Sequence, residues 1–139
     1  MTTIADKLQQ VQHRVAQACE RAGRDPASVL LLAVSKTFGP DAVLEAARAG
    51  QHAFGENYLQ EAVEKMAALR QMGAPTLQWH CIGPVQSNKT RLVAEHFDWM
   101  HTVDRLKVAQ RLSDQRPAHL PPLQVCIQIN VDGGANKSG

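Results

Sequence analysis

The stretch Val29-Leu30-Leu31-Leu32-Ala33-Val34, followed at once by the polar turn Ser35-Lys36-Thr37, decides the fold of this chain. Its six apolar residues are too few for a typical helix and too uniformly apolar for a strand with one face in water. Such runs are typical of parallel strands that helices cover on both faces. We therefore expect a buried parallel strand over 29–34, with Lys36 just beyond its carboxyl end.

An amphipathic helix is expected before this strand. Apolar residues recur there at alternating spacings of four and three, which places them on one face of a helix. They are Ile4, Leu8, Val11, Val15, Ala18 and Ala22. Thr3 and Asp6 match a capping box at the helix start, and Gly23 matches a C-terminal cap.

The pattern of strand and helix then repeats along the chain. A helix is predicted between Pro40 and Gly50. Further strands are predicted over 52–54, 77–82, 99–103 and 123–131, and further helices over 58–72, 87–96 and 105–116. Because the strand starts are almost evenly spaced, the pattern predicts an α/β fold of alternating parallel strands and covering helices.

Such even alternation favours a (β/α)8 TIM-type barrel, of which about five of the eight strands are present. A complete barrel usually has about 250 residues, whereas this chain has 139. We expect residues 1–139 to form a single barrel domain that is truncated at its C-terminus. An open doubly wound sheet is the alternative.

Composition and charge argue against several classes of function. The net charge is only +2, from 15 basic and 13 acidic residues without a basic run, which argues against nucleic acid and anionic membranes as partners. The N-terminus lacks the features of a signal peptide, and no apolar stretch approaches the length of a membrane span. Cys19, Cys81 and Cys126 fall in apolar segments and are expected to be reduced core residues. We therefore expect a cytoplasmic protein.

Lys36 is the first candidate for chemistry. In parallel β/α folds the loops after the strand carboxyl ends hold the ligand, and Lys36 lies in such a loop. Burial at the end of an apolar strand disfavours the charged ammonium and releases the amine nucleophile that a Schiff base needs. The alternative is a lysine whose charged end reaches past the strand into solvent. Position alone leaves both open.

Three motifs together favour the first of these alternatives. They are LLAVSKT at 31–37, FGENYLQE at 54–61 and WHCIGPVQSNK at 79–89. In their order and intervals they resemble three successive signatures of the pyridoxal 5′-phosphate (PLP) homeostasis protein family, and the similarity continues to Lys137-Ser138-Gly139. The resemblance implies an alanine-racemase-like barrel in which the lysine after the first strand holds PLP as a Schiff base, without robust catalysis. Lys36 is the matching position.

The resemblance implies further contacts with the cofactor. Asn57 matches an asparagine whose carboxamide would hydrogen-bond the pyridoxal 3′-oxygen, although capping its own helix together with Gln60 is the favoured role. Ile82 matches an apolar residue at one face of the pyridine ring, or is a plain core residue. His80 is the fourth candidate for contact with PLP, and a hydrogen-bonded core histidine is the favoured alternative. The resemblance implies no catalytic residue. No metal site is expected, because the histidines and cysteines lack metal-ligand spacings.

Some family features differ or are missing. The resemblance places the phosphate grip and the arginine beside the pyridine nitrogen in later strands that this chain lacks. Gly133-Gly134-Ala135 replaces the family's loop rich in asparagine and serine, and Phe38 replaces a charged residue. We therefore expect PLP to be held only at its imine end.

Three functional hypotheses follow. The first is a non-catalytic PLP-binding protein of PLP homeostasis, which buffers the cofactor or passes it to PLP-dependent enzymes. The second is a PLP-dependent amino-acid racemase, which the resemblance disfavours because such relatives use a tyrosine opposite the lysine and Tyr58 lies at a helix start. The third is a truncated apo scaffold that needs a partner to supply the missing strands. The oligomeric state stays open.

Overall fold

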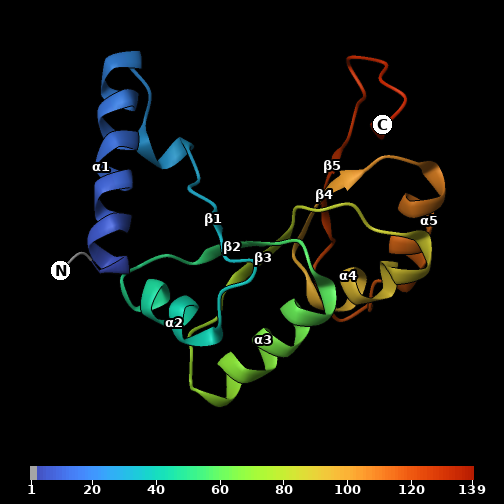
Figure 1. The fold of residues 1–139 in the computed structure, drawn as a ribbon, viewed down its shortest axis with the longest axis horizontal. Helices are drawn as coiled ribbons and strands as arrows, with labels where there is room; N and C mark the ends of the chain where they lie inside the picture. The colour runs from blue at the N-terminus through green and yellow to red at the C-terminus, as the bar shows by residue number, and fades with distance from the viewer. Residues whose placement is uncertain (1–2) are drawn as a thin grey trace.

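The computed structural model describes residues 3–139, which form a curved parallel sheet with helices on its outer side (Figure 1). The strands are β1 (Ala33–Val34), β2 (Ala53–Glu56), β3 (Gln78–Cys81), β4 (Trp99–Val103) and β5 (Gln124–Ile127). Each strand pairs in parallel with its neighbours in sequence, in the order β1-β2-β3-β4-β5. The predicted α/β array of five parallel strands is confirmed. Within residues 3–139 the barrel is not closed.

The first helix, α1 (Ile4–Ala22), has the predicted bounds and both predicted caps. The Thr3 hydroxyl accepts a hydrogen bond from the Asp6 backbone N–H at 3.1 Å, and the Asp6 carboxylate accepts one from the Thr3 N–H at 3.2 Å. Gly23 ends the helix with a φ of 67°, in the left-handed region that glycine adopts without steric penalty. The local sequence alone therefore determines both ends of this helix.

Four further helices connect the strands and cover the outer, convex side of the sheet (Figure 1). They are α2 (Pro40–Arg48), α3 (Leu59–Gln71), α4 (Thr90–His96) and α5 (Leu106–Gln115). Two short 3₁₀ helices, η1 (Pro26–Ser28) and η2 (Ser87–Lys89), complete the described elements. The helix predicted over 87–96 is thus two pieces. The backbone of Lys89, with φ −115° and ψ 1°, separates η2 from α4.

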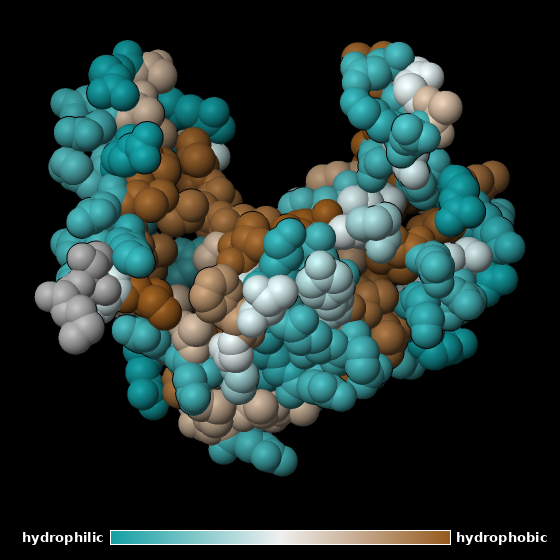
Figure 2. All heavy atoms as spheres, viewed as in Figure 1, coloured by the Kyte–Doolittle hydropathy of each residue, from teal (hydrophilic) through white to brown (hydrophobic). Residues whose placement is uncertain are grey.

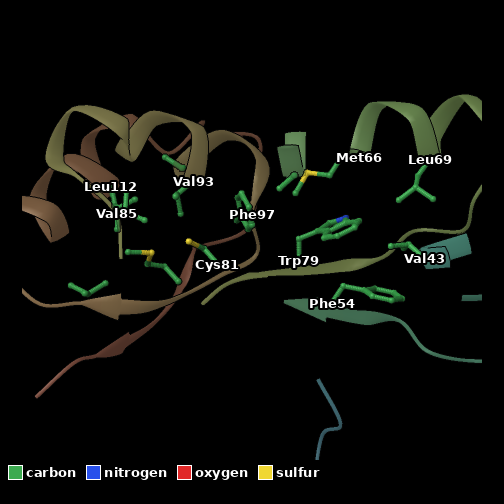
Figure 3. Close-up of a cluster of buried hydrophobic side chains, with 14 of the residues drawn as sticks. Val43, Phe54, Met66, Leu69, Trp79, Cys81, Val85, Val93, Phe97 and Leu112 are labelled. Carbon is green, nitrogen blue, oxygen red and sulfur yellow. The ribbon is translucent and has the colours of Figure 1, made fainter. Parts of the chain in front are cut away.

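The hydrophobic core lies between the sheet and these helices (Figure 3). Strand side chains on the outer face pack against helix side chains, and Phe54 and Trp79 contact each other with ring centroids 5.6 Å apart. Burying one such side chain contributes about 1.5–3 kcal/mol. The outer face of the sheet therefore stabilises the fold. The inner face carries the alternate strand residues, whose side chains point away from this core.

The inner face of the sheet is open within residues 3–139. Figure 2 shows a hollow between the arm that contains α1 and the arm that contains β5. Leu30 is 63% exposed and Val34 is 50% exposed, and every residue of β5 is exposed. The prediction that helices cover both faces of the first strand is wrong for the described residues, because all the connecting helices lie on the outer side.

The first strand is also shorter than the predicted 29–34. Only Ala33 and Val34 pair with β2, opposite Phe54 and Gly55. Before them the buried side chain of Gln51 takes the place of a neighbouring strand, since its amide donates to the Leu31 carbonyl at 2.7 Å. A side-chain hydrogen bond of this kind satisfies the backbone without extending the sheet.

The cysteines divide between the core and the surface. All three are free thiols; Cys19 and Cys81 are buried, and Cys126 is exposed. The prediction that all three lie in the core is wrong for Cys126, because β5 is at the open edge of the sheet. Among residues 3–139 no helix combines the length and apolar character needed to cross a membrane.

Candidate functional site

The candidate site lies at the carboxyl ends of three neighbouring strands. The Ser35 backbone N–H donates to the Gly55 carbonyl at 2.9 Å, and the Ile82 N–H donates to the Glu56 carbonyl at 3.0 Å, so the pairing continues one residue past β1 and β3. Lys36, Asn57 and Ile82 therefore follow adjacent strand ends at the same level of the sheet. The structure brings these three predicted residues to one edge, as expected from the parallel topology.

Lys36 lies in a tight turn directly after β1. The turn is closed by a hydrogen bond from the Phe38 N–H to the Ser35 carbonyl at 3.1 Å, and Thr37 has a φ of 68°. This left-handed conformation is rare for a β-branched residue, because its Cβ meets the backbone there. Lys36 itself is half-buried, and within residues 3–139 its ammonium has no hydrogen bond or ion pair.

A buried polar network supports this turn from the helix side. The Ser35 hydroxyl donates to one oxygen of the Glu56 carboxylate, and the Lys65 ammonium donates to the same oxygen at 2.8 Å. Lys65 also donates to the Ser35 backbone carbonyl at 2.8 Å. The side chains of Lys65 and Glu56 are 3% and 0% exposed. A charged pair of α3 and β2 is thus buried directly behind the residue that precedes Lys36.

The same network reaches the residue that follows Lys36. Glu61, in the first turn of α3, accepts a hydrogen bond from the Thr37 N–H at 2.8 Å and lies 3.3 Å from the Lys65 ammonium. The strained residue of the turn is therefore held by a carboxylate, which is a stronger acceptor than a neutral oxygen.

Glycines allow the strand ends to approach closely. A Cβ on Gly55 would lie 3.1 Å from the Ile82 side chain and 3.4 Å from that of Leu32, so Ile82 leans across β2 towards β1. A Cβ on Gly83 would lie 3.2 Å from Asn57. The glycine of the second motif therefore leaves room for Ile82, and the glycine of the third leaves room for Asn57.

Asn57 brings a buried polar atom without a partner to the predicted site. Its Oδ1 atom is buried and makes no hydrogen bond among the described residues, and α3 has no side-chain cap at its start. The helix-capping alternative for Asn57 is therefore not what the structure shows. Because a carboxamide can be turned to donate or to accept, this group suits a polar ligand atom.

His80 lies on the inner face of the sheet with both ring nitrogens engaged. Its Nε2 is 2.8 Å from the side-chain Oε1 of Gln78, and its Nδ1 is 2.8 Å from His101 Nε2. The ring stacks on Trp99 at 5.4 Å. Since the Gln78 oxygen only accepts, His80 must donate from Nε2 and accept from His101 at Nδ1.

This arrangement explains the low basicity of His80. Burial, and secondly the neighbouring His101, lower the pKa of His80 from 6.5 to about 4. Burial also lowers the pKa of His101. The environment is that of a hydrogen-bonded core histidine, and contact of His80 with a cofactor stays a prediction.

A shallow groove adjoins the site at the ends of β2, β3 and β4. It has a volume of about 800 Å³, and its lining includes Asn57, Tyr58, Pro84, Lys89 and Arg105. Two basic side chains thus face the same groove as the unpartnered carboxamide of Asn57. The lining does not include Lys36, so the groove and the lysine turn are separate features of this edge.

The network of Glu56, Glu61 and Lys65 was not predicted from the sequence. Two signals were present: an acid at the end of a strand that is otherwise buried, and the four-residue spacing of Glu61 and Lys65 on one helix face. Neither signal indicates burial by itself, because such charges are usually solvated. Glu56 and Lys65 are buried where they contact Ser35, which is far away in sequence, and the local sequence pattern does not show this contact.

The chain is similar in sequence to known proteins. The chain is 61% identical over 139 residues to the pyridoxal phosphate homeostasis protein of Pseudomonas aeruginosa, a match that covers 100% of this chain and 59% of that protein. The resemblance inferred from the three motifs is confirmed. The chain thus spans less than two thirds of the length of this relative.

Solved structures match as well. PipY of Synechococcus elongatus with PLP bound is 44% identical, with a TM-score of 0.61 over 73% of this chain and 47% of that chain. A protein of unknown function from Bifidobacterium adolescentis is 33% identical, with a TM-score of 0.81 over 98% of this chain and 58% of that chain. Both matches span most of this chain, and they indicate that its fold occurs within longer proteins.

A family model settles the classification. The model described as "Alanine racemase, N-terminal domain" matches residues 7–139. This range includes the three motifs, all five strands and the turn of Lys36. The chain belongs to the alanine racemase N-terminal domain family.

Proposed function

We propose that this chain binds PLP and serves PLP homeostasis, with Lys36 as the residue that holds the cofactor through a Schiff base. The observation that carries the proposal is the turn of Lys36, held at the carboxyl end of β1 beside Asn57 and Ile82. The names of the relatives support the same cofactor, since the chain resembles a pyridoxal phosphate homeostasis protein and a PLP-bound structure.

The side chains at this edge suit the cofactor. PLP supplies an aldehyde that an amine can bind reversibly, and the Lys36 ammonium is free of competing partners among the described residues. The unpartnered carboxamide of Asn57 suits the 3′-oxygen of the ring, and Ile82 offers an apolar surface to the ring face.

We also propose that the protein carries PLP without robust turnover. An amino-acid racemase needs a second acid or base on the opposite side of the substrate. Tyr58, the single tyrosine of the chain, is 54% exposed at the start of α3 and faces the groove. Delivery of PLP to PLP-dependent enzymes and a cytoplasmic location stay predictions.

A spectroscopic titration tests the proposal. Addition of PLP to the full chain should produce a visible absorbance band that borohydride bleaches, and Lys36→Ala should abolish it. Lys89→Ala is the matched control, because Lys89 faces the groove but not the lysine turn. An equal band in Lys36→Ala would contradict the assignment of Lys36.

A further inference from the structure

Three charged residues, Glu56, Glu61 and Lys65, bind the turn of Lys36 on both sides, and we call them the Lys65 clamp. Glu56 and Lys65 are buried, and Glu61 is partly exposed. We propose that the Lys65 clamp positions Lys36 for its carbonyl ligand. The proposal rests on the proposed function, because it gives these three positioning residues the task of preparing that lysine.

The contacts of the clamp surround Lys36 without touching its side chain. Ser35, the preceding residue, is bound through its hydroxyl by Glu56 and through its carbonyl by Lys65. Thr37, the following residue, is bound through its N–H by Glu61. The backbone on both sides of Lys36 is thus fixed, while the ammonium keeps no partner among residues 3–139.

The conformation of Thr37 requires contacts that hold its backbone in place. A β-branched residue at a φ of 68° occupies a sparsely populated region and stays there only when its surroundings hold it. The contact of the Thr37 N–H with Glu61, at 2.8 Å, is the hydrogen bond that holds it. Without this contact the turn is expected to relax towards extended backbone and to move the lysine that precedes Thr37.

A role in stability alone does not explain the clamp. The charges of Glu56 and Lys65 are almost completely buried, and Glu56 Oε1 has no hydrogen-bond partner among the described residues. The loss of hydration commonly offsets the attraction in a buried ion pair. Apolar residues of similar size would therefore stabilise the fold equally well. The buried charges are better explained by the specific geometry that they impose on the adjacent turn.

Glu61 offers the cleanest test, because its side chain is 37% exposed and its removal leaves the buried pair intact. Glu61→Ala in the full chain should weaken PLP binding about tenfold, the loss expected for one charge-assisted hydrogen bond. The PLP affinity of Glu61→Gln should lie between that of Glu61→Ala and that of the parent, since its carboxamide oxygen still accepts a hydrogen bond. Glu64→Ala is the matched control, because Glu64 is exposed on the same helix and bonds only to Gln60.

A second readout does not depend on the cofactor. In the PLP-free protein, the Thr37 amide should exchange with deuterium faster in Glu61→Ala than in Glu64→Ala, with unchanged melting temperatures. If Glu61→Ala lowers the melting temperature, the double variant Glu61→Ala/Thr37→Asn distinguishes a role in holding the turn from a role in stability alone. Asparagine adopts the left-handed region more readily, so PLP affinity should recover. Affinity that stays low in the double variant would show that Glu61 acts only through stability, and would overturn the proposal.

The other outcomes separate the two proposals. PLP affinity in Glu61→Ala equal to that of the parent, with the borohydride adduct still on Lys36, would overturn the Lys65 clamp and leave the proposed function intact. A parent protein whose adduct lies on another lysine would overturn the proposed function, and the clamp with it.

Discussion

At the scale of single residues, the site combines an amine without a partner among the described residues with a neighbouring network of hydrogen-bonded charges. Lys36 has no partner among the described residues, whereas Lys65, Glu56 and Glu61 are bound to one another and to the turn. This contrast distinguishes the two lysines. Lys36 is available for a ligand, and Lys65 serves the structure around it.

The ion pair within the clamp predicts a large effect on stability when only one partner is removed. Lys65→Met should lower the free energy of unfolding by about 3–5 kcal/mol, because it leaves the buried Glu56 carboxylate without a compensating charge. Adding Glu56→Gln should recover most of this loss, and urea denaturation of both variants measures it. If the double variant is no more stable than Lys65→Met, the loss does not arise from the uncompensated carboxylate.

The low pKa of His80 predicts a dependence of stability on pH. The folded protein keeps His80 neutral down to about pH 4, whereas an unfolded chain takes up the proton near pH 6.5. The contribution of neutral His80 to the free energy of unfolding is therefore fully present above pH 6.5 and is lost as the pH falls towards 4. The free energy of unfolding should decrease from pH 7 to pH 5, and by less in His80→Gln. An identical decrease in both proteins would show that His80 is not responsible.

At the scale of helices and strands, local sequence patterns predict some features well. The bounds and caps of α1 follow from apolar spacing, Thr3, Asp6 and Gly23, because all the contacts involved are local. The order of parallel strands also follows from the alternation of elements. By contrast, the length of β1 depends on the Gln51 side chain, which binds a carbonyl 20 residues away.

The same distinction applies to the candidate site. The positions of Lys36, Asn57 and Ile82 at strand ends follow from the topology and from the three motifs. The Lys65 clamp and the close approach of Gly83 to Asn57 do not, because they depend on packing between segments far apart in sequence. The exposure of Cys126 was missed for a related reason, since an apolar strand pattern does not show whether the strand lies at a sheet edge.

The capping box of α1 gives a prediction at this scale. Thr3→Ala removes the acceptor for the Asp6 N–H and should lower the opening free energy of the first turn by about 1 kcal/mol. Hydrogen exchange of the α1 amides measures this change. Ser113→Ala, at an exposed position of α5, is the control and should leave α1 unchanged. Equal exchange of α1 in the two variants would contradict the role of the cap.

At the scale of the whole molecule, the sheet has one stabilised face and one open face. The helices cover the outer side, whereas Val34, Ile127 and Ile129 are exposed. The chain spans 59% of the length of its Pseudomonas aeruginosa relative. The sequence resemblance predicts a phosphate grip in later strands, and under the proposed function the strand ends described here would hold the imine end of PLP.

If later strands hold the phosphate group, the 139-residue chain should have only a weak preference for PLP over pyridoxal. The 139-residue chain should bind PLP more weakly than the full-length relative from Pseudomonas aeruginosa, and should distinguish PLP less strongly from pyridoxal. Parallel titrations of both proteins with both ligands measure the two preferences. An equally strong preference for PLP in the 139-residue chain would place a phosphate site within these residues.

The identity of the lysine that holds PLP is the central claim, and mapping the reduced adduct tests it most directly. The full chain is loaded with PLP, reduced with borohydride, digested and analysed by peptide mass spectrometry. The predicted result is a pyridoxyl phosphate mass on the peptide that contains Lys36, with Lys65, Lys89 and Lys137 unmodified. A stoichiometric adduct on any of those lysines, with Lys36 unmodified, would contradict the account.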